Sequence, residues 1–253
     1  MKITFLGTGT SQGVPLIACD CKVCSSNDSK DKRLRTSIML SKNNTNFVFD
    51  TGPDFRTQML REKVKDLRAV IFTHEHKDHI AGLDDVRAFN YINKKKMDVY
   101  AENRVIGAIK REFAYAFSEN AYPGTPQIAL NEIENNLFAI DDVEFLPIRA
   151  MHMKLPVFGY RIDNFVYLTD ANFISHEEKN KMRNADVIVI NALRREVHPS
   201  HFNLQEAIDL MLDLKPKKAY FTHISHQLGL HQEVSLELPD FIEIAYDGLQ
   251  IEV

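Results

Sequence analysis

The sequence lacks any apolar stretch long enough to cross a membrane, because no segment approaches the roughly 18 apolar residues that a spanning helix needs. It also lacks an excess of charge of either sign, since 31 basic residues stand against 35 acidic ones. This balance excludes a global field that attracts nucleic acid or an anionic membrane, so anion binding must be local. The chain begins without a secretory hydrophobic stretch. We therefore expect a soluble cytoplasmic protein with no membrane partner.

Cysteine is scarce, and its distribution argues against a disulfide framework. The only cysteines are Cys19, Cys21 and Cys24, which crowd into one short segment. An odd, crowded set suits thiolate ligation of a metal better than disulfide pairing. A closed structural zinc site needs four ligands, so a fourth must come from elsewhere in the fold. The alternative is that these cysteines are free thiols in a reducing cytoplasm.

The order of apolar patterns predicts the fold class. At 253 residues and 44% hydrophobic composition the chain can bury one large core, so we expect a single domain over residues 1–253. Ser175 precedes Glu178, and Asn203 precedes Glu206, at the spacing of a helix capping box. The pattern indicates two β-rich halves flanked by helices, a layered α/β architecture. Predicted strands cover residues 2–6, 37–40, 47–49, 69–72, 143–148, 165–168, 187–190, 219–221 and 242–245, and predicted helices cover 55–63, 84–92, 104–117, 175–183 and 204–214.

Four potential metal ligands leave the end of one predicted strand together. The buried-strand pattern 69–72 runs into Thr73, after which His74, His76, Asp78 and His79 follow at short intervals. Imidazole and carboxylate groups on one tight loop suit two adjacent borderline divalent metals such as zinc, manganese or iron. A zincin helix is excluded, because its motif needs a histidine four places after His74, where this chain has Asp78.

The pattern His74-x-His76-x-Asp78-His79 resembles the signature loop of the metallo-β-lactamase superfamily. The resemblance implies a four-layer αββα sandwich with three further ligands that follow predicted strands: His152, Asp170 and His223. In such an arrangement one metal is held by His74, His76 and His152, the second by Asp78, His79 and His223, and Asp170 bridges them. Asp78 then also counts among the catalytic residues.

Within the superfamily the chain is similar over nearly its whole length to the PhnP-type phosphodiesterases. The similarity rests on the opening Gly7-Thr8-Gly9-Thr10, the stretch Asn191-Ala192-Leu193-Arg194, the segment from His198 to Leu204, and the ending Tyr246-Asp247-Gly248. The subgroup pairs an N-terminal cysteine cluster with a histidine after the last active-site ligand. This implies His226 as the fourth ligand of a structural zinc, while we expect His176 and His231 to be surface residues.

A binuclear site of this kind predicts hydrolysis without an organic cofactor. Two divalent ions, Mn²⁺ or Zn²⁺, about 3.5 to 4 Å apart can hold a water as hydroxide and bind the oxygens of a phosphodiester. The leaving alkoxide needs a proton, and we expect His201 to donate it, as a histidine in a similar context does in phosphodiesterase members of the superfamily. The alternative for His201 is a solvent-exposed loop residue. Arg194 is a candidate to grip phosphate oxygens, and an exposed salt bridge is the alternative.

The expected substrate is a small cyclic or linear phosphodiester, with nucleic acid a partner only as substrate. A tRNA 3′-end endonuclease is the first alternative, but the stretch between Asp170 and His201 leaves no room for a long basic arm. A thioester or other ester hydrolase and a non-enzymatic metal-bound binding protein are the others. A dinucleotide loop at Gly7-x-Gly9-x-x-x-Gly13 is excluded by its spacing and by the cysteines that follow. The sequence does not decide the oligomeric state, and a homodimer is one option.

Overall fold

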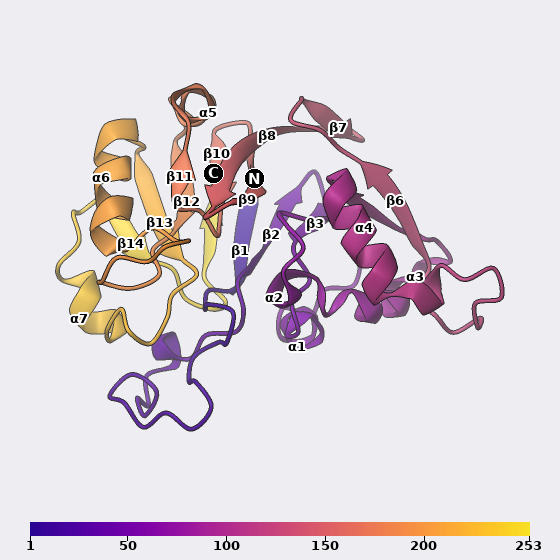
Figure 1. Ribbon diagram of the computed structural model, residues 1–253, viewed down its shortest axis with the longest axis horizontal. Coiled ribbons are helices and arrows are strands. Elements are labelled where there is room, and N and C mark those ends of the chain that lie inside the picture. The colour runs from indigo at the N-terminus through magenta and orange to yellow at the C-terminus, as the bar shows by residue number, and fades with distance from the viewer.

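The computed structural model describes residues 1–253 and places two mixed β-sheets face to face with helices outside them (Figure 1). The first sheet has seven strands in the order β15-β1-β2-β3-β4-β5-β6. Its strands are β1 (Lys2–Gly7), β2 (Ser37–Lys42), β3 (Thr45–Phe49), β4 (Ala69–Ile71), β5 (Met97–Ala101), β6 (Ile128–Glu132) and β15 (Gln250–Glu252). The second has eight, in the order β11-β8-β9-β10-β12-β13-β14, with β7 paired to β8. Its strands are β7 (Phe138–Ile140), β8 (Val143–His152), β9 (Leu155–Ile162), β10 (Phe165–Leu168), β11 (Phe173–Ile174), β12 (Val187–Asn191), β13 (Lys218–Thr222) and β14 (Ile242–Ile244).

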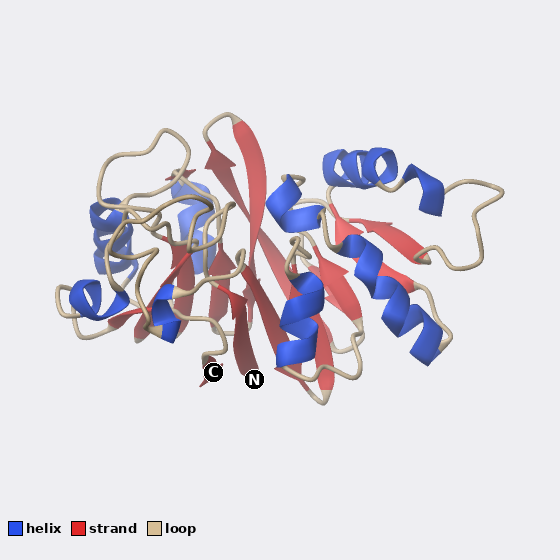
Figure 2. Ribbon diagram, turned by 90° about the horizontal axis from the view of Figure 1, so that it is seen from below, coloured by secondary structure: helices blue, strands red, loops and turns tan.

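The helices form the two outer layers, as the blue ribbons on both sides of the strands show in Figure 2. Over the first sheet lie α1 (Phe55–Arg61), α2 (Lys77–Ile80), α3 (Arg87–Asn93) and α4 (Asn103–Glu112), and over the second lie α5 (His176–Met182), α6 (Leu204–Leu214) and α7 (His231–Ser235). Three short 3-10 helices complete the list: η1 (Ser29–Asp31), η2 (Leu83–Val86) and η3 (Ala114–Ala116). None of these helices combines the length and the apolarity needed to cross a membrane.

Three separate hydrophobic clusters hold the four layers together. The middle cluster contains Phe47 and Phe49 from the first sheet and Val189 from the second, so it lies between the sheets. Val48, between the two phenylalanines, belongs instead to the cluster under α1, α3 and α4, and Ile188 belongs to the cluster under α5 and α6. Successive side chains of a strand point to opposite faces, so strands buried on both faces need apolar residues at every position. The predicted αββα sandwich is confirmed.

Most predicted elements are present, and two differ for local reasons. Strand 165–168 and helix 204–214 have the predicted bounds. The helix predicted over 84–92 is divided into η2 and α3, and the one predicted over 104–117 ends at Glu112, before η3. Asn203 makes the full capping box with Glu206. Ser175 accepts from the Glu178 amide as predicted, but the Glu178 carboxylate instead accepts from the Arg149 amide, because β8 lies beside α5.

Strand β9 is the largest element that the sequence pattern did not predict. It contains Pro156 and Gly159, two residues that weaken a strand prediction. Pro156 lies near the start of the strand, where a missing donor is tolerated. Gly159 packs so closely on Leu168 that a Cβ atom would come within 2.6 Å of that side chain and within 2.8 Å of the Tyr167 carbonyl. The glycine thus permits the close approach of β9 to β10.

Candidate metal centre

The predicted ligands lie at the carboxyl ends of strands. Strands β10, β12 and β13 run parallel, so their carboxyl ends meet at one edge of the second sheet. The residues are His74 and His76 after β4, Asp78 and His79 in α2, His152 at the end of β8, Asp170 after β10, and His223 after β13. Asp170 and His223 have positive φ angles of 53° and 55°. This backbone conformation is uncommon for residues other than glycine and concentrates at functional sites.

Asp170 lies at the centre of the cluster. Its Oδ2 atom is 3.2 Å from His223 Nε2 and 3.5 Å from His79 Nε2. It is 3.9 Å from His74 Nε2 on the other side. The remaining members lie around these groups: Asp78 Oδ2 is 3.2 Å from His79 Nε2, and the His76 ring is 4.6 Å from that of His74 and 5.1 Å from that of His152. The structure thus brings all seven residues together. The ligand atoms of Asp78, His79, Asp170 and His223 lie within 4.8 Å of one another, and Asp170 forms a second such group with His152 and His201.

The hydrogen bonds of two rings test whether the cluster fits a cation. His79 Nδ1 donates to Asp50 Oδ2 at 2.7 Å, and His152 Nδ1 donates to the Ser200 carbonyl at 2.7 Å. With Nδ1 protonated, the Nε2 atom of each ring carries a lone pair when the ring is neutral. Burial opposes the charged form of His79, but Asp78, Asp170 and Asp50 outweigh it and raise the pKa of this ring well above its ordinary value, so a bound cation would take the place of the Nε2 proton. The Nε2 atoms of His74, His79 and His223 are buried without a hydrogen-bond partner, an arrangement that costs about 1–3 kcal/mol for each unpaired group. Lone pairs and carboxylates around one space fit divalent metal ions such as zinc or manganese.

Burial and the two carboxylates set the protonation of the rings. Burial lowers the pKa of His74 well below its ordinary value and lowers the pKa of His152 to about 4, so both rings are neutral at pH 7. Burial also acts on His223, but Asp170 and Asp78 outweigh it and raise the pKa of His223 to about 9. A cation held by these carboxylates would take the place of that proton, because metal binding requires the neutral ring.

Asp50 and Thr73 orient the ligand loop, and the sequence analysis did not identify them. The Thr73 amide donates to Asp50 Oδ1 at 2.9 Å, and its hydroxyl donates to Asp50 Oδ2 at 2.8 Å. The same hydroxyl lies 2.9 Å from His74 Nδ1, from which it accepts. Asp50 directly follows β3, the parallel neighbour of β4. The signal in the sequence was an acidic residue directly after β3, the strand that lies beside β4 and so next to the ligand loop.

We expect Asp50→Asn to weaken metal binding or activity by about 10- to 100-fold, the usual cost of losing a group that orients a metal ligand. The amide replaces one acceptor oxygen with a donor, so either His79 or Thr73 loses its partner. Titration of zinc against a competing chelator measures the effect. Asp163→Asn is the matched control, since Asp163 lies on the surface and pairs with Lys42. Affinity and activity equal to those of the control would contradict an orienting role.

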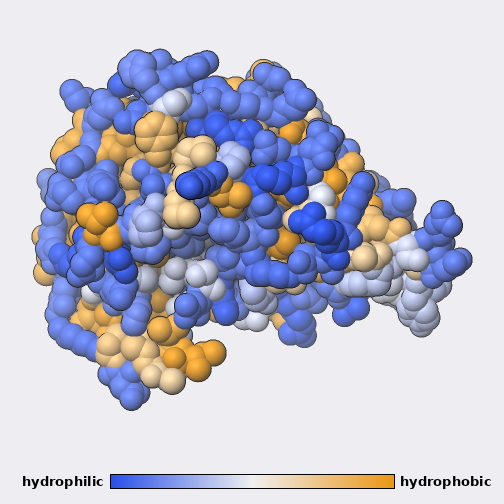
Figure 3. Space-filling view, in the orientation of Figure 1, coloured by the Kyte–Doolittle hydropathy of each residue, from blue (hydrophilic) through white to orange (hydrophobic).

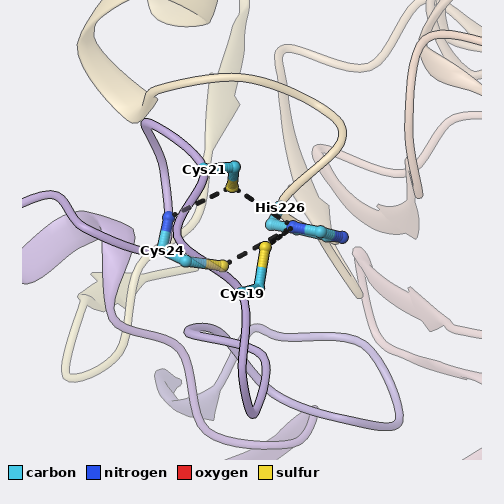
Figure 4. Close-up of side chains that lie close together, drawn as sticks. All are labelled: Cys19, Cys21, Cys24 and His226. Carbon is cyan, nitrogen blue, oxygen red and sulfur yellow. Dashed lines mark hydrogen bonds between the residues drawn. The ribbon is translucent and has the colours of Figure 1, made fainter.

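The three cysteines and His226 form a second cluster, drawn in Figure 4. His226 Nδ1 lies 3.3 Å from the Sγ atoms of Cys19 and Cys21 and 3.5 Å from that of Cys24. All four ligand atoms lie within 4.8 Å of one another, which suits a closed four-ligand zinc site. The amide of Cys24 donates to Cys21 Sγ and lowers the pKa of the Cys21 thiol to about 6. The geometry favours the zinc site over free thiols.

The loop that carries the cysteines projects from the sandwich. Figure 3 shows an apolar patch at the bottom of the view, over this loop, on a face that is otherwise mostly hydrophilic. Ile17, two residues before Cys19, is 92% exposed. Val23 and Cys24 of the same loop are buried, so the loop packs in part, and ligation by His226 would attach it to the loop after β13.

The structure corrects the prediction for one of the two histidines expected at the surface. His176 is exposed at the start of α5, as expected. His231 is buried, with 8% of its surface accessible. Its Nδ1 lies 3.3 Å from Arg33 Nη2, and its amide donates to Asp31 at 2.7 Å. The prediction failed because the loop between β1 and β2 covers α7, a contact between distant segments that sequence spacing does not reveal.

His201 lies beside the metal cluster, on the loop between β12 and α6. Its Nε2 atom is 3.3 Å from Asp170 Oδ2, and its ring stacks on that of His223 with centroids 4.8 Å apart. Only 8% of its surface is accessible, so the alternative of a solvent-exposed loop residue is wrong. Burial lowers the pKa of His201, and the bond to Asp170 opposes that shift.

Arg194 lies in the same loop, and its guanidinium donates hydrogen bonds within that loop and to one side chain outside it. It donates to the carbonyls of Glu196 and Val197 and to the Gln227 side chain, at 3.3, 2.9 and 3.2 Å. Gln227 follows His226, so Arg194 ties the His201 loop to the loop that carries the proposed zinc ligand. These contacts favour a role in holding the loop, and contact with substrate stays a prediction.

Comparison with known proteins identifies the family. A family model described as a beta-lactamase superfamily domain matches residues 45–224, which include every predicted ligand of the histidine and aspartate cluster. The chain belongs to this superfamily. A solved structure described as a new diphosphatase from the PhnP family superposes on it with a TM-score of 0.93 and 38% identity, over 100% of this chain and 97% of that one. The resemblance to the PhnP-type subgroup is thereby confirmed.

Two curated relatives differ from each other in name. An octanoyltransferase of Porphyromonas gingivalis is 40% identical over 253 residues, which is 99% of this chain and 51% of that protein. A ribonuclease Z of Nostoc punctiforme is 28% identical over 167 residues, which is 64% of this chain and 46% of that protein. This superfamily chain therefore spans about half the length of the curated relatives it matches.

We expect purified protein to contain about three metal ions per subunit, two in the histidine and aspartate cluster and one in the cysteine cluster. Elemental analysis after anaerobic preparation without chelators measures the content. In Cys21→Ser the content should fall by about one ion, because a closed site loses a ligand. Wild-type protein without metal at Cys19, Cys21 and Cys24 would contradict the zinc assignment.

Proposed function

We propose that the protein hydrolyses a small cyclic or linear phosphodiester. The observation that carries the proposal is the position of His201, whose Nε2 lies 3.3 Å from Asp170 Oδ2 at the centre of the ligand cluster. A histidine beside the metals is suited to protonate a leaving group, since its proton is within reach of a bound ester. Phosphodiester hydrolysis needs such an acid when the leaving group is an alkoxide.

The chain's own residues divide the work as follows. His74, His76 and His152 would hold one metal, Asp78, His79 and His223 the other, and Asp170 both. Two bound divalent ions supply an activated water and neutralise charge on the phosphate oxygens. Asp78 lies at the exposed side of the cluster, 12% accessible, where its carboxylate can also accept a hydrogen bond from the attacking water. The water loses one proton to solvent, its oxygen forms the new bond to phosphorus, and the bond to the leaving oxygen breaks. His201 gives its Nε2 proton to that oxygen and recovers one from solvent.

A tRNA 3′-end endonuclease is the first alternative, because the chain is similar to ribonuclease Z. Between Asp170 and His201 the structure has only β11, α5 and β12 with their short connections. No long arm that grips RNA lies there. The basic run of Lys94, Lys95 and Lys96 follows α3, where Lys94 adopts a left-handed conformation that ends the helix. A small diester is therefore favoured over folded RNA.

Acyl transfer or thioester hydrolysis is the second alternative, raised by the octanoyltransferase. That relative is about twice as long as this chain, so its named activity has room in the part that this chain does not match. A binding protein without activity is disfavoured because every ligand position is filled by histidine or aspartate. We also propose a cytoplasmic location, which suits three cysteines without a disulfide.

A substrate screen with added manganese or zinc tests the proposal. The panel contains 2′,3′-cyclic nucleotides, 1,2-cyclic ribose phosphates, bis(p-nitrophenyl) phosphate, a precursor tRNA and an octanoyl thioester. We expect turnover of one or more small diesters and weak or no cleavage of the other two. Preferential cleavage of the tRNA or of the thioester would overturn the proposal. His79→Ala is the control for metal-dependent activity.

A further inference from the structure

His198 lies three residues before His201 in the loop between β12 and α6, half-buried beside it. The Nδ1 atoms of the two rings are 3.1 Å apart, and the ring centroids are 5.0 Å apart. Ser200 also reaches this position: its hydroxyl is 3.3 Å from His198 Nδ1 and 3.1 Å from His201 Nδ1. The proposed acid therefore has a second histidine on the side of the ring opposite the metal cluster.

The hydrogen bonds decide which ring donates to which. The backbone amide of Ser200 donates to His198 Nδ1 at 3.4 Å. A backbone N–H can only donate, so His198 Nδ1 is an acceptor and the hydrogen of this ring is on Nε2. His201 Nδ1 must then carry a hydrogen and donate it to His198. Its other nitrogen, Nε2, faces the Asp170 carboxylate, which can only accept, so the acid form of His201 carries a hydrogen on both ring nitrogens.

We propose that His198 is a positioning residue that fixes the tautomer and orientation of His201. With Nδ1 of His201 held as a donor, every proton exchanged with the substrate passes through Nε2, which points at the metal cluster. This inference rests on the proposed role of His201 as the acid of phosphodiester hydrolysis. It follows the general pattern in which a base or acid histidine is oriented by a third group at its other ring nitrogen.

The loop backbone keeps His198 in place. Pro199 between His198 and Ser200 fixes its own φ angle, and its carbonyl accepts from the Asn172 side chain at 3.0 Å. The next carbonyl, that of Ser200, accepts from His152 Nδ1 at 2.7 Å. The carbonyls of Pro199 and Ser200 are therefore hydrogen-bonded to Asn172, in the segment after Asp170, and to the predicted metal ligand His152. This attachment holds the turn between the two histidines in one conformation.

His198→Leu tests the proposal, because leucine keeps an apolar side chain of similar size and removes the acceptor. On a diester with a poor alkoxide leaving group, we expect kcat to fall by about 10- to 100-fold, the usual cost of losing a group that orients a functional histidine. On bis(p-nitrophenyl) phosphate, whose leaving group needs little protonation, we expect a much smaller loss. KM and metal content should stay close to wild type.

His198→Asn supplies the conservative rescue. The Asn Oδ1 atom lies near the position of His Nδ1 and accepts hydrogen bonds, so it should restore most of the activity that leucine loses. His176→Asn is the matched control for the same exchange, since His176 is exposed on α5 and far along the chain from the loop. In zinc-loaded protein, ¹⁵N NMR of the histidine rings should show His201 protonated at Nδ1 in wild type and in His198→Asn.

The outcomes separate this inference from the proposed function. Suppose that His201→Ala shows a loss of activity that depends on the leaving group. If His198→Leu then shows no loss, or an equal loss on the two esters, the positioning role of His198 is overturned and the acid role of His201 stands. An unprotonated His201 Nδ1 in the wild-type NMR spectrum overturns it too, without reference to activity. If wild type cleaves no diester, both fail. If His198→Leu does not fold, activity of His198→Asn equal to that of His201→Ala overturns the proposal, and near-wild-type activity supports it.

Discussion

His79→Ala is expected to lower turnover by more than about 10³-fold, above the 10² to 10³ that loss of one electrostatic group in an active site usually costs. The His79 ring is fully buried, and its Nε2 lies 3.2 Å from Asp78 Oδ2 and 3.5 Å from Asp170 Oδ2. Removing it takes one of four ligands from one proposed metal. Asp50 keeps two donors from Thr73 after the change, so we expect thermal stability to stay comparatively close to wild type.

Cys21→Ser is expected to have the opposite effect, a large loss of stability with little change in turnover per folded molecule. Cys21 is exposed, so the exchange removes almost no packing, and the effect must come from the metal. Binding of a structural zinc is folding free energy, about 10–16 kcal/mol in zinc-finger peptides. Thermal unfolding with and without chelator, together with turnover normalised to folded protein, measures both properties.

Asp20→Ser is the matched control for this pair, because Asp20 is an exposed residue between two of the cysteines. It should leave stability and turnover unchanged. If His79→Ala and Cys21→Ser alter stability and turnover to the same extent, the division into a catalytic centre and a structural site is wrong.

The sequence predicted the candidate site better than it predicted the fold around it. His152, Asp170 and His223 each follow an apolar run that is a strand in the structure, and carboxyl ends of neighbouring strands meet at one edge of a sheet. To predict that these three residues lie together, only the positions of the strand ends were needed. The registers and the strand order, which bring β15 beside β1, needed contacts between distant segments that one sequence does not contain.

The elements that were missed have weak local patterns. Strand β6 is half-exposed at the edge of the first sheet, and β5 is a five-residue strand in which only alternate residues are fully buried. Their stability comes from pairing with a neighbour rather than from local preference. The orienting groups Asp50 and His198 were missed for a related reason. Each acts on a residue already identified, and only the three-dimensional arrangement shows that contact.

His201→Ala is expected to lower turnover by about 10² to 10⁴ on a diester with a poor alkoxide leaving group, the usual range for loss of general acid catalysis. His201 Nε2 is directed at Asp170 from outside the group of seven predicted ligands. All seven predicted ligands, Asp170 among them, remain in the variant and would keep the metals in place. We therefore expect metal content to remain at the wild-type level, and elemental analysis of the variant checks this directly.

The dependence on leaving group distinguishes the acid role from general damage to the site. An alkoxide departs only when it receives a proton, so an alkyl ester should show the full loss in His201→Ala. p-Nitrophenolate departs with little need for a proton, so bis(p-nitrophenyl) phosphate should be much less sensitive to the same change. An equal loss on both esters would assign His201 to positioning of substrate phosphate or to support of a metal ligand, since a ring nitrogen of His201 lies within 4.8 Å of ligand atoms of His152 and Asp170. No loss on either ester would remove the main argument for a phosphodiesterase and leave the burial of His201 beside Asp170 as a structural contact only.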